Sequence, residues 1–243
     1  MEWSGRGHVL AVRPHGETSA IVELLTEDQG RHAGLVRGGR SRTLRPVLQP
    51  GNSVTAIWRA RLADHLGHYT IEADIARAGL VMDDALSLAG LNSACALACQ
   101  ALPERESHAP VYRAMEVFLD ALGDIDIWPA LYVRWEFGLL RDLGYGMDLE
   151  KCAVTGEVEG LTHVSPRTGR AVSRDAAAPY LDKLLALPRF LRDPEAGFDT
   201  GDITNGLALT GFFLQRRVLW PMDRDLPESR MRLIKALTDA GHV

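Results

Sequence analysis

The spacing of apolar residues changes near Ala76, and this change limits what the chain can fold into. Before that point, short apolar runs are separated by clusters of turn-forming residues; after it, apolar residues recur three and four positions apart. The first pattern is typical of β-strands and the second of amphipathic helices. Strands followed by helices predict an α+β protein with a β domain and then a helical domain.

The β domain is predicted over residues 1–78. In one apolar run, Val54, Ala56 and Trp58 alternate with more exposed positions, as expected of a strand with one buried face. Five short strands fit an OB-fold β-barrel, and they also suit other small barrels. The predicted strands are GHVLAVR, TSAIVELLT, RHAGLVR, SVTAIWRA and YTIEA.

The helical domain is predicted as a bundle in two parts, residues 79–147 and 175–243. Gly144 is predicted to end a helix, because glycine favours the position after a helix C-terminus. The uncharged run Ala85–Leu102 contains Ser87, Asn92 and Gln100, so we expect a buried bundle helix and not a membrane span. Residues 148–174 form a small insert between the two parts.

Cysteine usage and the N-terminus predict a cytoplasmic protein. Three cysteines are too few for a disulfide framework, and the first residues lack the apolar core of a signal peptide. Cys95 and Cys99 lie one helical turn apart among Ala and Leu. We expect small buried hydrophobic side chains there and not metal ligands.

The common catalytic motifs are missing, so the chain is predicted not to be an enzyme and to have no catalytic residue. It contains no phosphate-binding GxxxxGK[ST] loop, no GxSxG elbow and no HExxH helix, and its glycines lack dinucleotide-binding spacing. Asp64, His65 and His68 could form a metal site, but a solvated turn is the preferred interpretation.

The insert has the Gly/Pro composition of a zinc knuckle but only one thiol, that of Cys152. A structural zinc site needs four ligands, usually from two CxxC pairs, and Thr155 stands where the first pair would end. His163 is the only other good ligand. The insert is therefore predicted to bind no metal, and no cofactor is expected.

Charge is distributed unevenly along the chain. The net charge is −5, yet residues 1–77 contain 10 Arg and 8 acidic residues, whereas the remainder contains 17 basic and 24 acidic residues. No Asp or Glu occurs from Gln29 to Ala63. That segment predicts a nucleic-acid-binding surface, with a solvated basic loop as the alternative. It contains Arg31, Arg37, Arg40, Arg42, Arg45, Arg59 and Arg61. Trp58 beside Arg59 would either stack on bases or face the barrel core.

Two stretches resemble the bacterial DNA repair protein RecO family. The first is VLAVRPHGETSAIVELLTEDQGRHAGLVRGGRSRTLRPVLQPGNSV, which is similar to the family's N-terminal OB-fold. The second is YVRWEFGLLRDLGYGMDLEKCAVTGE, which is similar to the helix, the Leu-Gly-Tyr stop and the start of the zinc-finger-like region. The family pattern has four zinc ligands, and this chain keeps only Cys152.

The resemblance implies a recombination mediator. Such a protein would bind single- and double-stranded DNA, anneal complementary strands, and with RecR help to load RecA onto DNA coated by single-strand binding protein. Five arginines of the acid-free segment would correspond in character, and not by exact position, to the family's DNA-contacting face: Arg31, Arg37, Arg40, Arg42 and Arg45. No membrane partner is implied, and nucleoid association would follow from DNA binding.

The resemblance also implies a partner surface in the helical domain, for the acidic C-terminal tail of single-strand binding protein. Arg134 and Arg230 match family arginines, and Arg216 and Arg217 are weaker candidates; intrabundle ion pairs or helix-surface charges are the alternative. Two other functions stay open: an adaptor that binds RecR and single-strand binding protein with little DNA affinity of its own, and an OB-fold RNA-binding factor.

Overall fold

The computed structural model describes all 243 residues, which divide into two compact units. The first comprises Met1–Ile125 with Pro227–Leu233, and the second comprises Asp126–Leu226 with Ile234–Val243. The first unit contains all the strands of a closed barrel, and the second contains a three-stranded sheet and helices. The predicted α+β class is confirmed.

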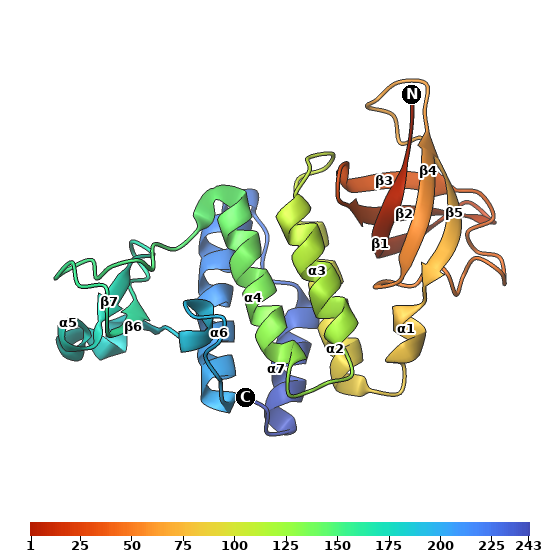
Figure 1. The fold of residues 1–243 in the computed structure, drawn as a ribbon. Helices are drawn as coiled ribbons and strands as arrows, with labels where there is room; N and C mark the ends of the chain where they lie inside the picture. The colour runs from red at the N-terminus through yellow and green to blue at the C-terminus, as the bar shows by residue number, and fades with distance from the viewer. The chain divides into compact units, whose positions relative to one another are not determined.

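The barrel has five strands in the order β1-β2-β3-β5-β4 (Figure 1). All neighbours are antiparallel except β3 and β5, and this order is that of an OB-fold. A bulge between Val9 and Ala11 lets the long β1 pair with β4 along its first half and with β2 along its second. The strands are β1 (Glu2–His15), β2 (Ser19–Thr26), β3 (Gly30–Val36), β4 (Ser53–Arg59) and β5 (His68–Ile75).

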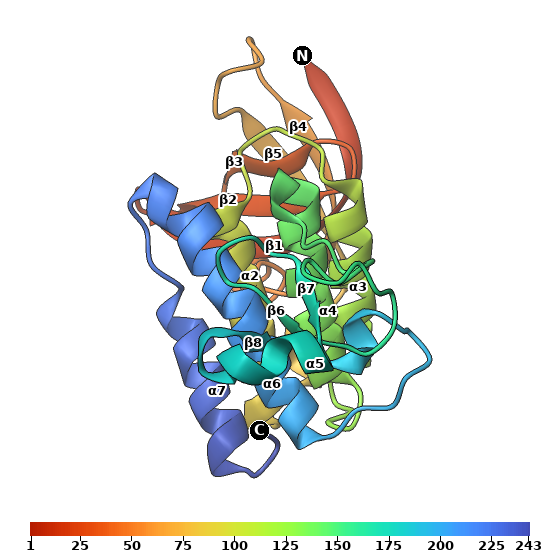
Figure 2. The same ribbon diagram turned by 90° about the vertical axis from the view of Figure 1, so that its left-hand side faces the viewer.

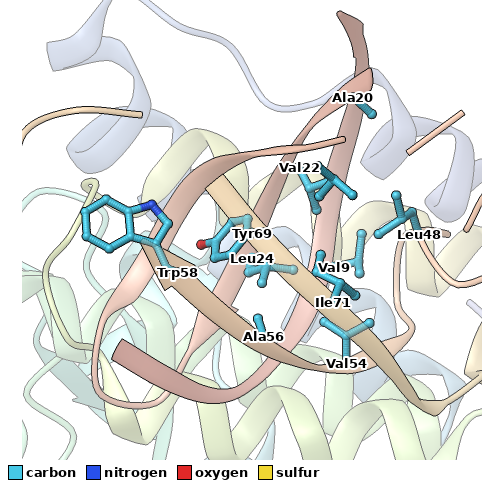
Figure 3. Packing of buried hydrophobic residues seen from close by; sticks show 11 residues of the cluster. Val9, Ala20, Val22, Leu24, Leu48, Val54, Ala56, Trp58, Tyr69 and Ile71 are labelled. Atoms are coloured by element: carbon cyan, nitrogen blue, oxygen red, sulfur yellow. The ribbon is translucent and has the colours of Figure 1, made fainter. Parts of the chain in front are cut away.

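One buried apolar cluster fills the barrel (Figure 3). Trp58 lies at one end of this cluster and Leu48, from the connection between β3 and β4, at the other. The Trp58 side chain is only 2% exposed, and its indole N–H donates to the Leu66 carbonyl at 2.9 Å. Of the two interpretations of Trp58, the structure therefore supports the core position and excludes stacking on a nucleic-acid base.

Helices α1 (Arg77–Leu80), α2 (Ala85–Ala101) and α3 (Ala109–Ala121) complete the first unit. Asp84 caps α2 by accepting hydrogen bonds from the Leu86 and Ser87 amides. Cys95 is buried in α2 and donates to the Val9 carbonyl at 3.7 Å, whereas Cys99 is half-buried. No helix is long and apolar enough to cross a membrane.

The second unit is built around α4 (Trp128–Leu140) and α6 (Thr200–Phe213). The Gly206 backbone approaches Val133 so closely that a Cβ would lie 2.7 Å from its side chain. The Thr210 hydroxyl donates to the buried Glu136 carboxylate at 2.5 Å.

Gly144, with φ +84, lies in the turn η1 (Arg141–Tyr145) that ends α4, as predicted. The helix α6 continues through η4 (Leu214–Leu219) and η5 (Trp220–Met222). The last helix is α7 (Glu228–Asp239).

The insert is larger than its predicted range of 148–174. Its sheet has the order β7-β6-β8, and β8 (Leu185–Ala186) pairs with β6 (Leu161–Val164). Figure 2 shows this sheet beside α5 (Arg174–Ala177). The other elements are β7 (Ala171–Ser173), η2 (Ala178–Lys183) and η3 (Arg189–Leu191). The sheet therefore includes Leu185 and Ala186, which lie in the range 175–243 predicted as the second part of the bundle.

Candidate nucleic-acid interface

The connection between β3 and β4, residues 37–52, caps one end of the barrel. Leu48 is inserted into the core cluster, and Leu44 and Val47 pack against it. The Asn52 side-chain amide donates to the Pro46 and Val47 carbonyls at 2.9 and 3.0 Å. We call residues 37–52 the cap segment. Its apolar residues face inward, so its arginines are left on the outside.

Four of the predicted DNA-contacting arginines lie on the cap segment, and all four are exposed. Arg40 donates to the carbonyls of Gly16 and Glu17, and Arg37 lies 3.5 Å from a ring nitrogen of His68. Arg42 and Arg45 make no side-chain hydrogen bond or ion pair. None of the four forms an ion pair with an acidic side chain, and the cap segment itself contains no Asp or Glu.

Two more predicted arginines lie at the end of β4. Arg59 is exposed but forms a bidentate ion pair with Glu2 at 2.8 and 3.0 Å, so its charge is compensated. Arg61 is exposed in the connection between β4 and β5 and has no such partner. Arg105, from the link between α2 and α3, donates to the Ala63 and His65 carbonyls and so holds this connection. Nothing in the sequence pointed to that contact, which spans about forty residues.

Arg31 does not belong to the exposed group. Its side chain is 12% exposed and pairs with Glu23 at 2.7 Å and Glu104 at 3.5 Å. It also donates to the Leu102 carbonyl at 2.9 Å. Arg31 therefore joins β3 to the end of α2 and is not available to a ligand. The sequence could not show this, because Glu104 and Leu102 are more than seventy residues away.

Arg6 of β1 and Arg77 of α1 are tied to α3 in the same way. Arg77 is buried and pairs with Asp120 at 2.5 Å, and Arg6 pairs with Glu116 at 3.2 Å. Arg77 also donates to the Ser53 hydroxyl. The barrel thus has two kinds of arginine: those bound to acidic residues inside the first unit, and the acid-free group on the cap segment.

The buried histidines add no positive charge to the barrel at neutral pH. Burial, reinforced by the charges of Arg77 and Arg6, lowers the pKa of His8 to about 3. Burial likewise lowers the pKa of His32 to about 4. His32 lies beside Trp58 and Tyr69 at the end of the core opposite Leu48. Arginine is therefore the source of the basic character of this unit.

The predicted partner-binding arginines of the second unit mostly contact their own surroundings. Arg134 donates to the Phe190 and Pro194 carbonyls and lies over the Phe190 ring, so it holds the segment 189–194. Arg217 lies 4.8 Å from the Phe213 ring centroid and is half-buried.

Arg216 is the exception among them. It is exposed and lies between the Phe212 and Trp220 rings, 5.2 and 5.3 Å from their centroids. Trp220 is 50% exposed. Arg230, the remaining predicted arginine, belongs to the first unit and is 2% exposed, so its side chain is buried and does not fit the predicted partner contact. Of the four predicted partner-binding arginines, only Arg216 is exposed, and the exposed Trp220, which the sequence analysis did not single out, lies beside it.

Backbone amides surround the single thiol of the insert. The Cys152 thiol accepts hydrogen bonds from the amides of Val154, Thr155 and Ser173 at 3.2–3.5 Å. Desolvation raises the pKa of this thiol, but the hydrogen bonds from Ser173 and Thr155 outweigh it and lower the pKa to about 6. No three His, Cys, Asp or Glu side chains come together as ligands. One thiol does not fit a four-ligand zinc site.

The closed barrel with its strand order places the chain among OB-fold proteins. Residues 1–76 match the family Recombination protein O N terminal, and residues 82–225 match Recombination protein O C terminal. A protein of Phenylobacterium zucineum named DNA repair protein RecO is 51% identical over all of both chains. Proteins of the same name from Caulobacter vibrioides and Rhodospirillum rubrum are 49% and 51% identical and cover 99% and 98% of this chain, and 99% and 96% of their own. The chain belongs to the RecO family of DNA repair proteins.

Proposed function

We propose that this chain is a recombination mediator that binds single- and double-stranded DNA and anneals complementary strands. In this proposal it acts with RecR to promote the loading of RecA onto DNA coated by single-strand binding protein. It works in the cytoplasm at the nucleoid, without catalytic residues and without zinc. The single observation that supports DNA binding is the acid-free group of exposed arginines on the cap segment.

Annealing requires a protein that neutralises two strands while leaving their base edges free to pair. Arg37, Arg40, Arg42 and Arg45 suit phosphate contacts of this kind, because a guanidinium without an internal acidic partner keeps its full charge for a phosphate. Arg61, in the connection between β4 and β5, adds one more positive charge without an acidic partner. Binding that rests on phosphate contacts has little sequence preference and weakens steeply as salt rises.

The test is the binding of a fluorescent single-stranded oligonucleotide across a salt series, with the annealing of its complement followed in parallel. The variant replaces Arg37, Arg40 and Arg42 by Ala. We expect its affinity to fall at least about tenfold, and its log–log salt slope to decrease by up to about three.

The matched control replaces Arg141, Arg174 and Arg189 by Ala. These arginines are exposed in the second unit, and their loss changes the net charge equally. Its affinity should stay near that of the unchanged chain. Equal affinity of the two triple variants would contradict the proposal.

A second candidate function is that of an adaptor, favoured by Arg216 and Trp220. An exposed guanidinium between two aromatic rings suits a peptide that combines acidic and apolar residues, such as the tail of single-strand binding protein. The adaptor alone would bind a fluorescent tail peptide but not the oligonucleotide. Replacing Arg216 by Ala should weaken peptide binding several-fold, and replacing exposed Arg224 should not.

A further inference from the structure

A pocket of about 500 Å³ opens between the cap segment and the hairpin of β1 and β2. Its lining includes the buried Ala20 and Leu48 and the half-buried Val12, which we call the apolar floor, and the exposed Arg40, Arg45 and Gln49, which we call the rim. All of these residues belong to the first unit. The pocket combines apolar and polar lining groups, and its volume lies in the usual range of a small-molecule site.

The pocket exists because the cap segment approaches β2 closely. A Cβ at Gly39 would lie 2.9 Å from the Ala20 side chain, so the approach requires glycine. The Gly39 amide donates to the Val36 carbonyl, and the Arg40 amide donates to the Thr18 carbonyl at 3.0 Å. The backbone on this side of the pocket is therefore fixed before any ligand arrives.

The two rim arginines are prepared for an anion in different ways. Nη1 of Arg40 donates to Gly16 and Glu17, which holds the guanidinium in place and leaves its Nε and Nη2 donors uncommitted. Arg45 has no side-chain partner and can move. Gln49 donates its amide to the Arg45 carbonyl at 2.8 Å, so its amide oxygen is left to accept a hydrogen bond.

We infer that this pocket receives one unpaired base of a DNA strand, while Arg40 and Arg45 hold the adjacent phosphate. A base combines apolar faces with polar edges, which matches the apolar floor and the free Gln49 oxygen, and a guanidinium can stack on its plane. A base inside a duplex stays stacked and paired, so only a single strand delivers one without the cost of unpairing. The inference rests on the proposed DNA binding and adds to it a preference for unpaired strands.

The experiment compares a fluorescent oligothymidylate with a strand of equal length in which half of the bases are missing. The phosphates are the same, so only the bases differ. We expect the protein to bind the intact strand about three- to fivefold more tightly, the size of one cation–π contact. Equal affinity for the two strands would overturn the inference without requiring any variant.

A variant then tests the place of the contact. Val12→Phe fills the pocket floor and should remove the preference for the intact strand, with no change in affinity for the strand lacking bases. Ile57→Phe is the control, because Ile57 is also half-buried in the barrel but does not line the pocket. Loss of the preference in the control as well, or its persistence in Val12→Phe, would overturn the assignment to this pocket.

Two further measurements distinguish a DNA base from a free nucleotide as the ligand, and failure of the pocket from failure of the proposed DNA binding. Thymidine monophosphate should compete with the strand only at far higher concentration; competition at equal concentration would identify a site for a free nucleotide and overturn the inference. If the Arg37, Arg40 and Arg42 variant kept full DNA affinity, the proposed function itself would fail. If that variant lost affinity while the intact strand had no advantage, only the base pocket would fail.

Discussion

The arginines of the cap segment, in the first unit, and Arg134, in the second, are used differently. On the cap segment, Arg42 and Arg45 are exposed and have no side-chain partner, and Arg40 contacts only carbonyls. In the second unit, Arg134 makes three hydrogen bonds to carbonyls of the segment that it holds. A cation bound inside the protein contributes to stability, whereas one without a partner contributes little and is free for a ligand.

The same contrast occurs within the first unit, at the two ends of β3. Arg31 is held by Glu23 and Glu104, while Arg37, at the end of the same strand, has no acidic neighbour. Two arginines six residues apart therefore have separate roles. The number of arginines in a segment is therefore larger than the number available to a ligand, because arginines in internal ion pairs do not count.

The largest effect on stability is expected for Arg31→Met. The variant keeps the aliphatic length but leaves the Leu102 carbonyl and part of the Glu23 charge without a donor. We expect the free energy of unfolding in urea to fall by about 2 kcal/mol. DNA affinity should not change at a temperature where the variant is folded. Arg42→Met is the control and should leave stability within about 0.5 kcal/mol. Similar stability losses in both would remove the distinction between held and free arginines.

Arg134→Ala should have a smaller effect. It removes the hydrogen bonds to Phe190 and Pro194 and the contact with the Phe190 ring, so we expect a loss of about 1–2 kcal/mol. Amide hydrogen exchange should accelerate in residues 189–194. Arg141→Ala, at an exposed position, is the control. Unchanged exchange in that segment would show that Arg134 is free for a partner after all.

Adding an acid to the acid-free segment should weaken DNA binding directly. Thr43→Glu places a carboxylate on the exposed side of the cap segment, and we expect a loss of about three- to fivefold in oligonucleotide affinity at low salt. Thr204→Glu changes the net charge equally at an exposed position of α6 and should have little effect. Equal losses would mean that net charge, and not the local surface, determines affinity.

The smallest effect is expected for Arg59→Ala. The Arg59 and Glu2 side chains are 57% and 55% exposed, and an exposed pair contributes little to stability because solvent screens it. Because Glu2 offsets the charge of Arg59, its removal should change oligonucleotide affinity by less than about twofold. Arg61→Ala should have the larger effect, since Arg61 is not offset. A larger loss of oligonucleotide affinity in Arg59→Ala than in Arg61→Ala would show that DNA displaces Glu2 from Arg59.

Much of the fold could be predicted from local pattern. Alternation in β4 located a strand with one buried face, and Gly144 located the end of α4, because these signals depend on near neighbours in the chain. The limits of the insert could not be predicted, since β8 has two residues and is defined only by its pairing with β6. The sequence left two positions open for Trp58, on the surface or in the barrel core, for a similar reason. Its burial depends on closure of the barrel.

The sequence by itself determined the α+β class and the acid-free segment, because both follow from the order of residue types along the chain. Only the tertiary structure decided which arginines of that segment are free. Arg31 differs from Arg42 through Glu104 and Leu102, which folding brings to it from another part of the chain. The base pocket likewise required β1, β2 and the cap segment to meet, and a contact between distant segments has no signature in local sequence.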